Sequence, residues 1–195
     1  MLDRNGAWEA VLENAYDIIV TGEINGEDTL SFKIPYRDGK RGYIDSEKKI
    51  QIVDDVYKVR TVTDTRDTDG RAVTEVYAEA EFYDLTFSVR KEERTFEAEY
   101  PETAMAYALE GTEWSVGTVT VRTQRTWTST EKNALSILRN TADLHGGDLV
   151  FDCPNRLVHL LTVNGKDSGA LFAYKKNMKS IQRVVDTREL VTRLY

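Results

Sequence analysis

Apolar and polar residues alternate with a period of two through most of the first ninety residues, the pattern of half-buried β-strands. The clearest case is a pair of segments, Ile18 to Ile24 and Thr29 to Ile34, that flank Asn25-Gly26. Asn-Gly favours the positive φ angles of a tight hairpin turn. The sequence therefore predicts a β-hairpin over residues 18–34.

The same alternation continues after this hairpin. The stretch Lys48–Thr65 predicts two strands with a turn at Asp54-Asp55, and a further strand runs from Ala72 to Phe87 after a turn at Thr68-Asp69-Gly70. Five or six short strands with tight turns are typical of an antiparallel barrel or sandwich. The expected core or edge anchors of the last strand are Val73, Val76, Tyr77, Phe82 and Leu85.

Helical patterns appear only after residue 100. Pro101 and Glu102 suit the first turn of a short helix that Gly111 ends, and Ala104, Tyr107 and Ala108 share one of its faces. A stronger helix follows, with Thr128 and Glu131 as a capping box and His145-Gly146-Gly147 as its end, where a histidine cation suits the helix dipole. Its expected buried stripe is Leu135, Leu138 and Ala142, with Ala134 and Ile137 beside it.

The end of the chain predicts a discontinuous domain. Residues 148–176 read as a short antiparallel meander on which the second helix packs, with strands over 148–152, 157–164 and 169–176 and turns at 153–156 and Asn164-Gly165, and the chain becomes extended again from Met178. This last segment has no evident partner nearby, so we expect it to rejoin the first barrel. The predicted fold is a β-rich α+β protein, in which 1–89 plus 179–195 form an antiparallel β-barrel or sandwich and 90–178 form an inserted α+β domain.

Composition narrows the class of protein. The 195 residues include one cysteine, Cys153, and no run approaching the ~20 apolar residues of a membrane helix, so we expect a soluble protein that folds in a reducing cytoplasm without a signal peptide. The net charge is −7, but residues 1–100 hold 14 basic against 23 acidic side chains and residues 101–195 hold 12 against 10. An acidic half argues against a general nucleic-acid binder. It is either a solvated surface or one that repels a polyanion or meets a basic partner.

Searches for catalytic chemistry find little. The two histidines, His145 and His159, have no metal-ligand spacing around them, and Cys153 has no linked histidine. Phosphate-binding glycine motifs are absent. Adjacent acids such as Asp54-Asp55 and Glu92-Glu93 would point to opposite faces of a strand, and Asp64, Asp67 and Asp69 fit a turn better than a calcium loop. We therefore predict no catalytic, cofactor-binding or metal-binding residues.

Aromatic residues near polar loops leave one binding alternative open. Trp8, Tyr36 and Tyr43 lie near polar loops and would suit stacking on sugars in a receptor-binding module, although packing in the barrel or at a subunit contact is the simpler explanation. For the three tryptophans, Trp8, Trp114 and Trp127, we expect at least two to lie in the core.

Several separated blocks, in order, resemble the phage minor structural protein family, also known as the N-terminal region of the prophage tail endopeptidase or tail-associated lysin. The first three blocks lie in the β-rich part, the fourth covers the short helix and a Gly-Thr-x-Trp turn, and the fifth is the extended end. They are Ile24–Pro35, Lys49–Val62, Val76–Leu85, Thr103–Val119 and Tyr174–Tyr195.

The resemblance implies a baseplate hub at a virion tail tip, made in the cytoplasm of a bacterial host and similar in fold to contractile-tail hubs and type VI secretion spikes. Such hubs are homotrimers that join the distal tail protein to a tail fibre or lysin domains and enclose the channel through which DNA passes without specific binding. Each subunit carries two related barrels. We expect this chain to stop where the second begins, and any wall-degrading activity to lie in downstream domains.

Two readings follow for function. As a structural module, the chain would contact neighbouring subunits through exposed barrel edges, and acids at hairpin tips would face the lumen or an adjacent ring. As an enzyme, a cell-wall endopeptidase or glycosidase, it would need a converging acid–base pair or a metal site, which the sequence does not show. The candidate lumen or inter-subunit residues are Glu23, Glu27, Asp28, Asp67 and Asp69.

Overall fold

The computed structural model describes residues 1–163, except 5, 54, 67–69, 71 and 131, together with Gly165 and Gly169. Residues 1–164 form one compact unit and residues 165–195 a second. Only the first unit is described below. The predicted return of residues 179–195 to the first barrel therefore lies outside the described residues and stays a prediction, as does the proposed domain division that depends on it.

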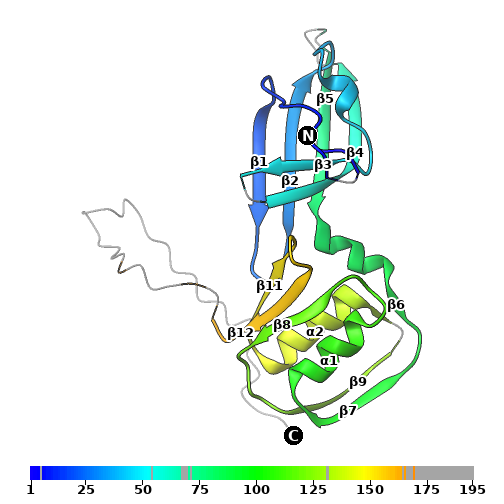
Figure 1. The fold of residues 1–195 in the computed structure, drawn as a ribbon, viewed down its shortest axis with the longest axis vertical. Helices are drawn as coiled ribbons and strands as arrows, with labels where there is room; N and C mark the ends of the chain where they lie inside the picture. Colours follow the sequence, from blue (N-terminus) through cyan, green and yellow to red (C-terminus); the bar gives the residue numbers. More distant parts are fainter. Residues whose placement is uncertain are drawn as a thin grey trace, which may run out of the picture. The chain divides into compact units, whose positions relative to one another are not determined.

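A curled antiparallel sheet of five strands forms the first half of this unit, which confirms the predicted β-rich fold class (Figure 1). The strand order is β1-β2-β5-β4-β3, so β1 and β3 are the two end strands. A register shift between Val59 and Thr61 interrupts the β4–β5 pairing. The strands are β1 (Tyr16–Gly22), β2 (Asp28–Pro35), β3 (Lys49–Ile52), β4 (Asp55–Arg66) and β5 (Ala72–Ala80), with a short 3-10 helix, η1 (Arg41–Tyr43), between β2 and β3.

The predicted hairpins are present, with small shifts. The β1–β2 turn contains Asn25, whose φ of 59° is the positive value that the Asn-Gly signal predicts. The β3–β4 turn comes earlier than predicted, because Val53 has a φ of 56° and Asp55 already pairs with Ile52. Arg66 pairs with Ala72, which supports the third hairpin, although Thr68 and Asp69 lie outside the described residues.

The prediction of one strand from Ala72 to Phe87 is wrong at its end. β5 stops at Ala80, and residues Glu81–Phe87 form the 3-10 helix η2. The buried apolar residues of this segment are Phe82 and Leu85, three positions apart, which is the spacing that places two side chains on one side of a 3-10 helix. In so short a segment, apolar residues three positions apart resemble a continuation of the alternation in β5, and for this reason the sequence predicts a strand where the structure has a 3-10 helix.

The second half of the unit contains two helices and three small sheets. The helices α1 (Pro101–Leu109) and α2 (Ala134–His145) pack against each other. β7 pairs with β9 and β6 with β10, while β11, β12 and β8 form a three-stranded sheet in which β12 is central. The strands are β6 (Val89–Arg90), β7 (Arg94–Glu99), β8 (Ser115–Val119), β9 (Arg125–Ser129), β10 (Lys132–Asn133), β11 (Asp148–Asp152) and β12 (Leu157–Leu161).

The strand β12 makes a contact that the sequence does not predict. It pairs antiparallel with β11, as expected for the meander, and parallel with β8, which lies about forty residues earlier in the chain. The pairing also depends on Gly117, because a Cβ at this position would lie 2.6 Å from two atoms of the His159 ring. The Nδ1 atom of that ring accepts a hydrogen bond of 2.8 Å from the Thr118 amide.

The helix α2 begins later than the capping box predicts. Asn133 is its N-cap, and its side-chain oxygen accepts a 2.8 Å hydrogen bond from the Ser136 amide. Thr128, the predicted cap, lies instead in β9 opposite Thr95, and Glu131 lies outside the described residues. The predicted C-terminal end is confirmed, since Gly146 has a φ of 75° and its amide donates to the Ala142 carbonyl.

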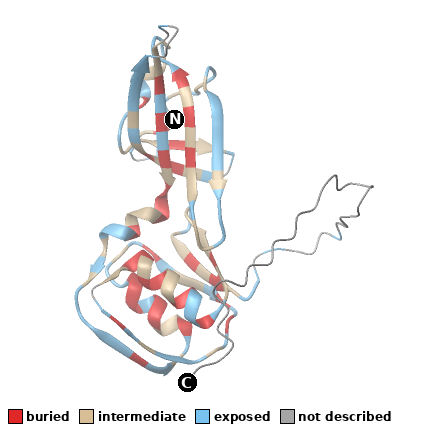
Figure 2. Cartoon of the chain, turned by 180° about the vertical axis from the view of Figure 1, so that it is seen from behind, coloured by how far each residue is buried: buried red, intermediate tan, exposed pale blue. Residues whose placement is uncertain are grey.

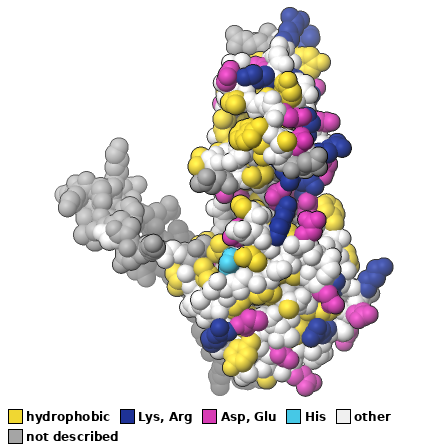
Figure 3. Space-filling view, in the orientation of Figure 1, with side chains coloured by type: hydrophobic (Ala, Val, Ile, Leu, Met, Phe, Trp, Pro, Cys, Tyr) yellow, Lys and Arg dark blue, Asp and Glu magenta, His cyan; other side chains and the backbone are white. Residues whose placement is uncertain are grey.

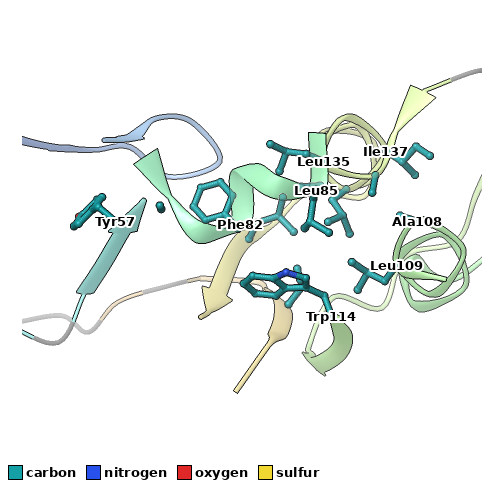
Figure 4. Close-up of a cluster of buried hydrophobic side chains, with 14 of the residues drawn as sticks. Tyr57, Phe82, Leu85, Ala108, Leu109, Trp114, Leu135 and Ile137 are labelled. Carbon is teal, nitrogen blue, oxygen red and sulfur yellow. The ribbon is translucent and has the colours of Figure 1, made fainter. Parts of the chain in front are cut away.

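The two halves share a continuous hydrophobic core. Burial alternates along β2 and β5, and in the helices it falls on the sides that face each other (Figure 2). The predicted stripes of both helices are buried. Leu85 of η2 lies among Leu135 and Ile137 of α2 and the end of α1, with Trp114 nearby (Figure 4). Of the other tryptophans, Trp127 is half-buried and Trp8 exposed.

Candidate assembly surface and domain junction

The strand β1 is a sheet edge with an apolar surface. Among the strands that the structure describes, it pairs on one side only, with β2. Ile18, Ile19 and Val20, at its centre, are 52%, 58% and 49% exposed, so side chains on both faces of the strand are open to solvent. Free edges of this kind are templates for pairing with another strand, and proteins usually protect them with charges, prolines or cover. The exposed apolar edge is therefore a candidate contact with another chain.

A hollow of about 210 Å³ lies beside this edge. Ile18 of β1 and Ile50 of β3 both line it, so the two end strands of the curled sheet meet the same hollow. Its other walls include Phe32 and the N-terminal residues Trp8 and Val11, of which Trp8 is 66% exposed. The face of the molecule drawn in Figure 3 shows hydrophobic side chains scattered among charged ones over the sheet.

Charges on the sheet are largely arranged in ion pairs. Arg60 contacts Glu47, Glu79 and Asp84 at 2.6–3.1 Å, and Lys58 contacts Glu47 and Asp84. Figure 3 likewise shows acidic and basic side chains intermingled on the face drawn. Part of the acidic surplus of the first half is therefore neutralised locally, whereas Glu23 and Glu27 at the tip of the β1–β2 hairpin are exposed.

The hairpin tip holds three of the five predicted contact residues. Glu23 and Glu27 are exposed, while Asp28 is half-buried and accepts a 3.0 Å hydrogen bond from the Tyr57 hydroxyl. Burial raises the pKa of Asp28 above its ordinary value and the nearby Asp55 charge raises it further, whereas the Tyr57 hydrogen bond lowers it. Asp28 therefore serves the packing of the sheet. Asp67 and Asp69 lie outside the described residues.

The tip also contacts the second half of the unit, which the sequence does not predict. The Asn25 side chain donates to the Gly147 carbonyl at 2.9 Å and accepts from the Leu149 amide at 2.7 Å. Arg139 of α2 donates to the Gly26 carbonyl at 2.7 Å. Arg139 and Leu149, with Glu23 to Asp28, line a second hollow at the junction.

Aromatic and charged side chains of η2 complete the junction. The Phe82 ring stacks on Phe151 of β11 with 4.0 Å between centroids. The buried carboxylate of Glu81 contacts Lys49 of β3 at 2.7 Å and Arg156, in the β11–β12 turn, at 3.4 Å. A buried carboxylate is stable when it is paired in this way, so Glu81 fixes groups from both halves around itself.

The predicted sugar-stacking residues do not share a hollow. Trp8 lines the hollow beside β1, whereas Tyr36 lines another one with Arg37 and Arg66. Tyr43 lies beneath the Lys48 ammonium, 5.9 Å from the ring centroid. A joint aromatic platform for a carbohydrate is not formed by these three side chains in the part of the chain that the structure describes.

Groups with catalytic potential are held in structural roles. Burial raises the pKa of the Cys153 thiol to about 11, so the reactive thiolate is disfavoured at neutral pH. Among the described residues, no cluster of three or more His, Cys, Asp or Glu side chains forms a metal site, and no helix is long and apolar enough to cross a membrane.

The buried His145 gives a pH prediction. Burial lowers its pKa below 6.5, even though its Nδ1 donates to the Thr123 carbonyl at 3.0 Å, so the ring is neutral at pH 7 and not the cation predicted for a helix end. The unfolded chain takes up a proton near 6.5, and we expect the free energy of unfolding to decrease as the pH falls from 6.5 through the lower folded pKa.

Denaturant unfolding measured at several pH values checks this. The variant H145Q should show a flatter profile than the parent protein between neutral and mildly acidic pH. An equal slope in H145Q and the parent would contradict the assignment.

Family models match both halves of the described unit. Residues 1–80 match the prophage endopeptidase tail N-terminal domain and residues 88–160 match the prophage endopeptidase tail domain. The residues between the two matches, 81–87, are those of η2, where the sheet gives way to the helical half. No curated protein sequence matches the chain.

Solved structures of tail proteins share the fold. The prophage tail protein gp18 from Listeria monocytogenes EGD-e aligns with a TM-score of 0.73 and 14% identity over 91% of this chain and 55% of that one. The 43 kDa tail protein of prophage MuSo2 from Shewanella oneidensis gives 0.52 and 10% over 79% and 50%, and the tail protein from Neisseria meningitidis MC58 gives 0.51 and 11% over 81% and 48%.

The chain thus spans about half the length of the solved tail proteins that it matches. At these identities the solved structures show only that the fold is shared, whereas the two consecutive domain matches show the family. The chain is a prophage tail protein that carries the N-terminal domains of the prophage endopeptidase tail family.

Proposed function

We propose that this chain is the N-terminal part of a baseplate hub, a structural component at the tip of the tail of a phage or prophage. In this role it forms a homotrimer in the assembled tail, joins the distal tail protein to a tail fibre or lysin domains, and contributes to the channel through which DNA reaches the host cell. The observation that carries the proposal is the open apolar edge of β1 on a domain of a tail-protein family.

An open edge suits an assembly protein because, within the described part of the chain, no strand pairs with the outer side of β1 and its side chains are exposed. Ile18, Ile19 and Val20 offer apolar side chains on both faces of the strand. A heterologous contact between an edge and a different surface of the next copy closes into a ring when the rotation is one third of a turn. The proposed occupant of the β1 edge is therefore a neighbouring copy of this chain.

The proposal assigns wall-degrading activity to other domains of the full protein. Support comes from the described residues, in which burial keeps the thiol of Cys153 protonated and no three His, Cys, Asp or Glu side chains are grouped as a metal site would require. The family name refers to an endopeptidase, and the two matched domains are its tail domains.

The hairpin tip provides a test of the channel. We propose that Glu23 and Glu27 face the lumen, where carboxylates repel DNA phosphates and let the genome pass without binding. Virions carrying E23K together with E27K should eject their DNA more slowly after receptor triggering, with the effect stronger at low salt because the added contacts are electrostatic. Time-resolved fluorescence of a DNA dye reports the ejection.

A control separates lumen charge from general charge reversal. Glu93 and Glu97 are also exposed acids but lie beside and in β7, within the second matched domain. The E93K and E97K pair changes the net charge equally and should leave ejection at the parental rate. Parental kinetics in the hairpin-tip pair would remove the lumen assignment, and the assembly role would then depend on the β1 edge alone.

A further inference from the structure

The tip of the β1–β2 hairpin is fastened to the second domain by a side chain with two directional hydrogen bonds. Asn25 donates its amide hydrogen to the Gly147 carbonyl and accepts from the Leu149 amide, at 2.9 and 2.7 Å. The side-chain amide thus satisfies one backbone acceptor and one backbone donor at the start of β11. Gly147 and Leu149 lie 122 and 124 residues from Asn25 in the sequence. The two hydrogen bonds are therefore tertiary contacts and not part of the turn itself.

The backbone around this contact has little freedom to rearrange. A Cβ on Gly26 would lie 2.7 and 2.8 Å from Glu23 side-chain atoms, and one on Gly147 would lie 2.9 Å from the Leu161 carbonyl and 2.8 Å from Val121. Gly147 also has a φ of 134°, which other residues rarely adopt. Both sides of the contact are therefore shaped by glycines that permit close approach.

The hydrogen bonds of Asn25 connect the two matched domains at a second place, away from the point where the chain passes from one to the other. The chain passes from the first matched domain to the second once, through η2, whose Phe82 and Leu85 are buried. Close to this connection the domains are also held by the stack of Phe82 on Phe151 and by the ion pairs of Glu81 with Lys49 and Arg156. A second set of contacts at the hairpin tip, from Asn25 to β11 and from Arg139 to Gly26, opposes rotation of one domain about that connection.

We propose that Asn25 is an inter-domain latch, which holds the two domains as one rigid body so that a force or contact on β1 is transmitted to α2 and β11. The proposal goes beyond the assembly role and does not require it, because the latch acts within a single chain. Arg139 supports it by holding the Gly26 carbonyl at 2.7 Å, with its guanidinium 5.7 Å from the Tyr83 ring centroid.

The test uses N25G in the full chain. Glycine keeps the positive φ without strain and removes only the side chain, so the turn itself is preserved. Spin labels are placed at exposed positions in the two domains, as T63C and Q124C in a C153S background, and their distance distribution is measured by pulsed electron resonance. A narrow distribution is expected in the parent and a clearly broader one in N25G.

Exchange of the Leu149 amide gives a direct second readout. This amide loses its acceptor in N25G and should exchange about tenfold faster or more, the factor that corresponds to the net contribution of one hydrogen bond. The matched control is V53G, which places glycine at the positive-φ turn between β3 and β4, where the valine side chain is 83% exposed. This control should change neither the distance distribution nor the Leu149 exchange.

Each outcome decides the proposal. Broadening and faster Leu149 exchange in N25G but not in V53G support the latch. An unchanged distance distribution in N25G overturns it, even if Leu149 exchanges faster, because η2 alone would then hold the domains. Equal broadening in both variants also overturns it, because the effect would come from loosening any turn of the sheet. None of these results depends on whether the protein forms a trimer.

Discussion

Replacing Ile19 with lysine is expected to leave the subunit folded and to abolish its incorporation into tails. Ile19 is 58% exposed at the centre of the β1 edge, so the substitution should change the free energy of unfolding by no more than about 0.5 kcal/mol. A charge on an edge strand prevents pairing with a second strand, because the ammonium would have to lose its hydration in the contact. Tail particles from an induced lysogen, probed for the protein, report the loss.

The matched control for this prediction is V89K. Val89 is a similarly exposed apolar residue, at 53%, but lies in the two-residue strand β6 away from the β1 edge. Tails containing V89K at the parental level, together with tails lacking I19K, would localise the contact. If I19K enters tails as readily as the parent protein, then β1 is not the assembly edge.

The second large effect is expected from F82A. Phe82 is 4% exposed and stacks on both Phe151 and Tyr83, with 4.0 and 4.7 Å between ring centroids, so its removal leaves a cavity at the junction of the two domains. Truncation of a buried phenylalanine costs about 3–5 kcal/mol in the free energy of unfolding. Denaturant unfolding followed by fluorescence measures this loss.

The same 3-10 helix supplies the control. Phe87 ends η2 but is 76% exposed, so F87A should cost no more than roughly 0.5–1 kcal/mol, most of it from the contact with the Arg60 guanidinium. A loss below about 1 kcal/mol in F82A would show that the junction repacks around the missing ring, and the junction would then contribute less to stability than its burial implies.

Local patterns predict most of this fold because they act over a few residues. The hairpin at Asn25-Gly26 and the buried stripes of α1 and α2 follow from turn chemistry and from a period that one helix or strand sets by itself. The error in η2 arises at a change of period, where three residues per turn and two residues per repeat both fit a short apolar run.

Long-range pairing decides the features that the sequence does not predict. Thr128 is a good capping residue, but its pairing with Thr95 keeps it extended in β9, and the helix begins at the next suitable cap, Asn133. The parallel contact of β8 with β12 leaves no local trace. In both cases a ladder formed with a distant strand outweighs the preference of a single residue.

In the candidate site, too, local features are predictable from the sequence and long-range contacts are not. Glu23 and Glu27 are recognisable as acids at a hairpin tip, so their exposure is predictable. The contact of Asn25 with Gly147 and Leu149 is not, because the turn alone already accounts for an asparagine before glycine. The residue fits two requirements at once, and only the local one is visible in the sequence.

The parallel pairing of β8 with β12 has a consequence for synthesis of the protein on the ribosome. All five strands of the first sheet are available once residue 80 has emerged, so that sheet is free to form early. The three-stranded sheet of the second domain cannot complete its central strand until Leu161 has left the exit tunnel, and until then β8 and β11 lack their shared neighbour. During that interval the nascent chain carries the five paired strands of the first sheet and an incomplete second domain with exposed apolar residues, and this is the stage at which a chaperone or a neighbouring nascent copy would meet it.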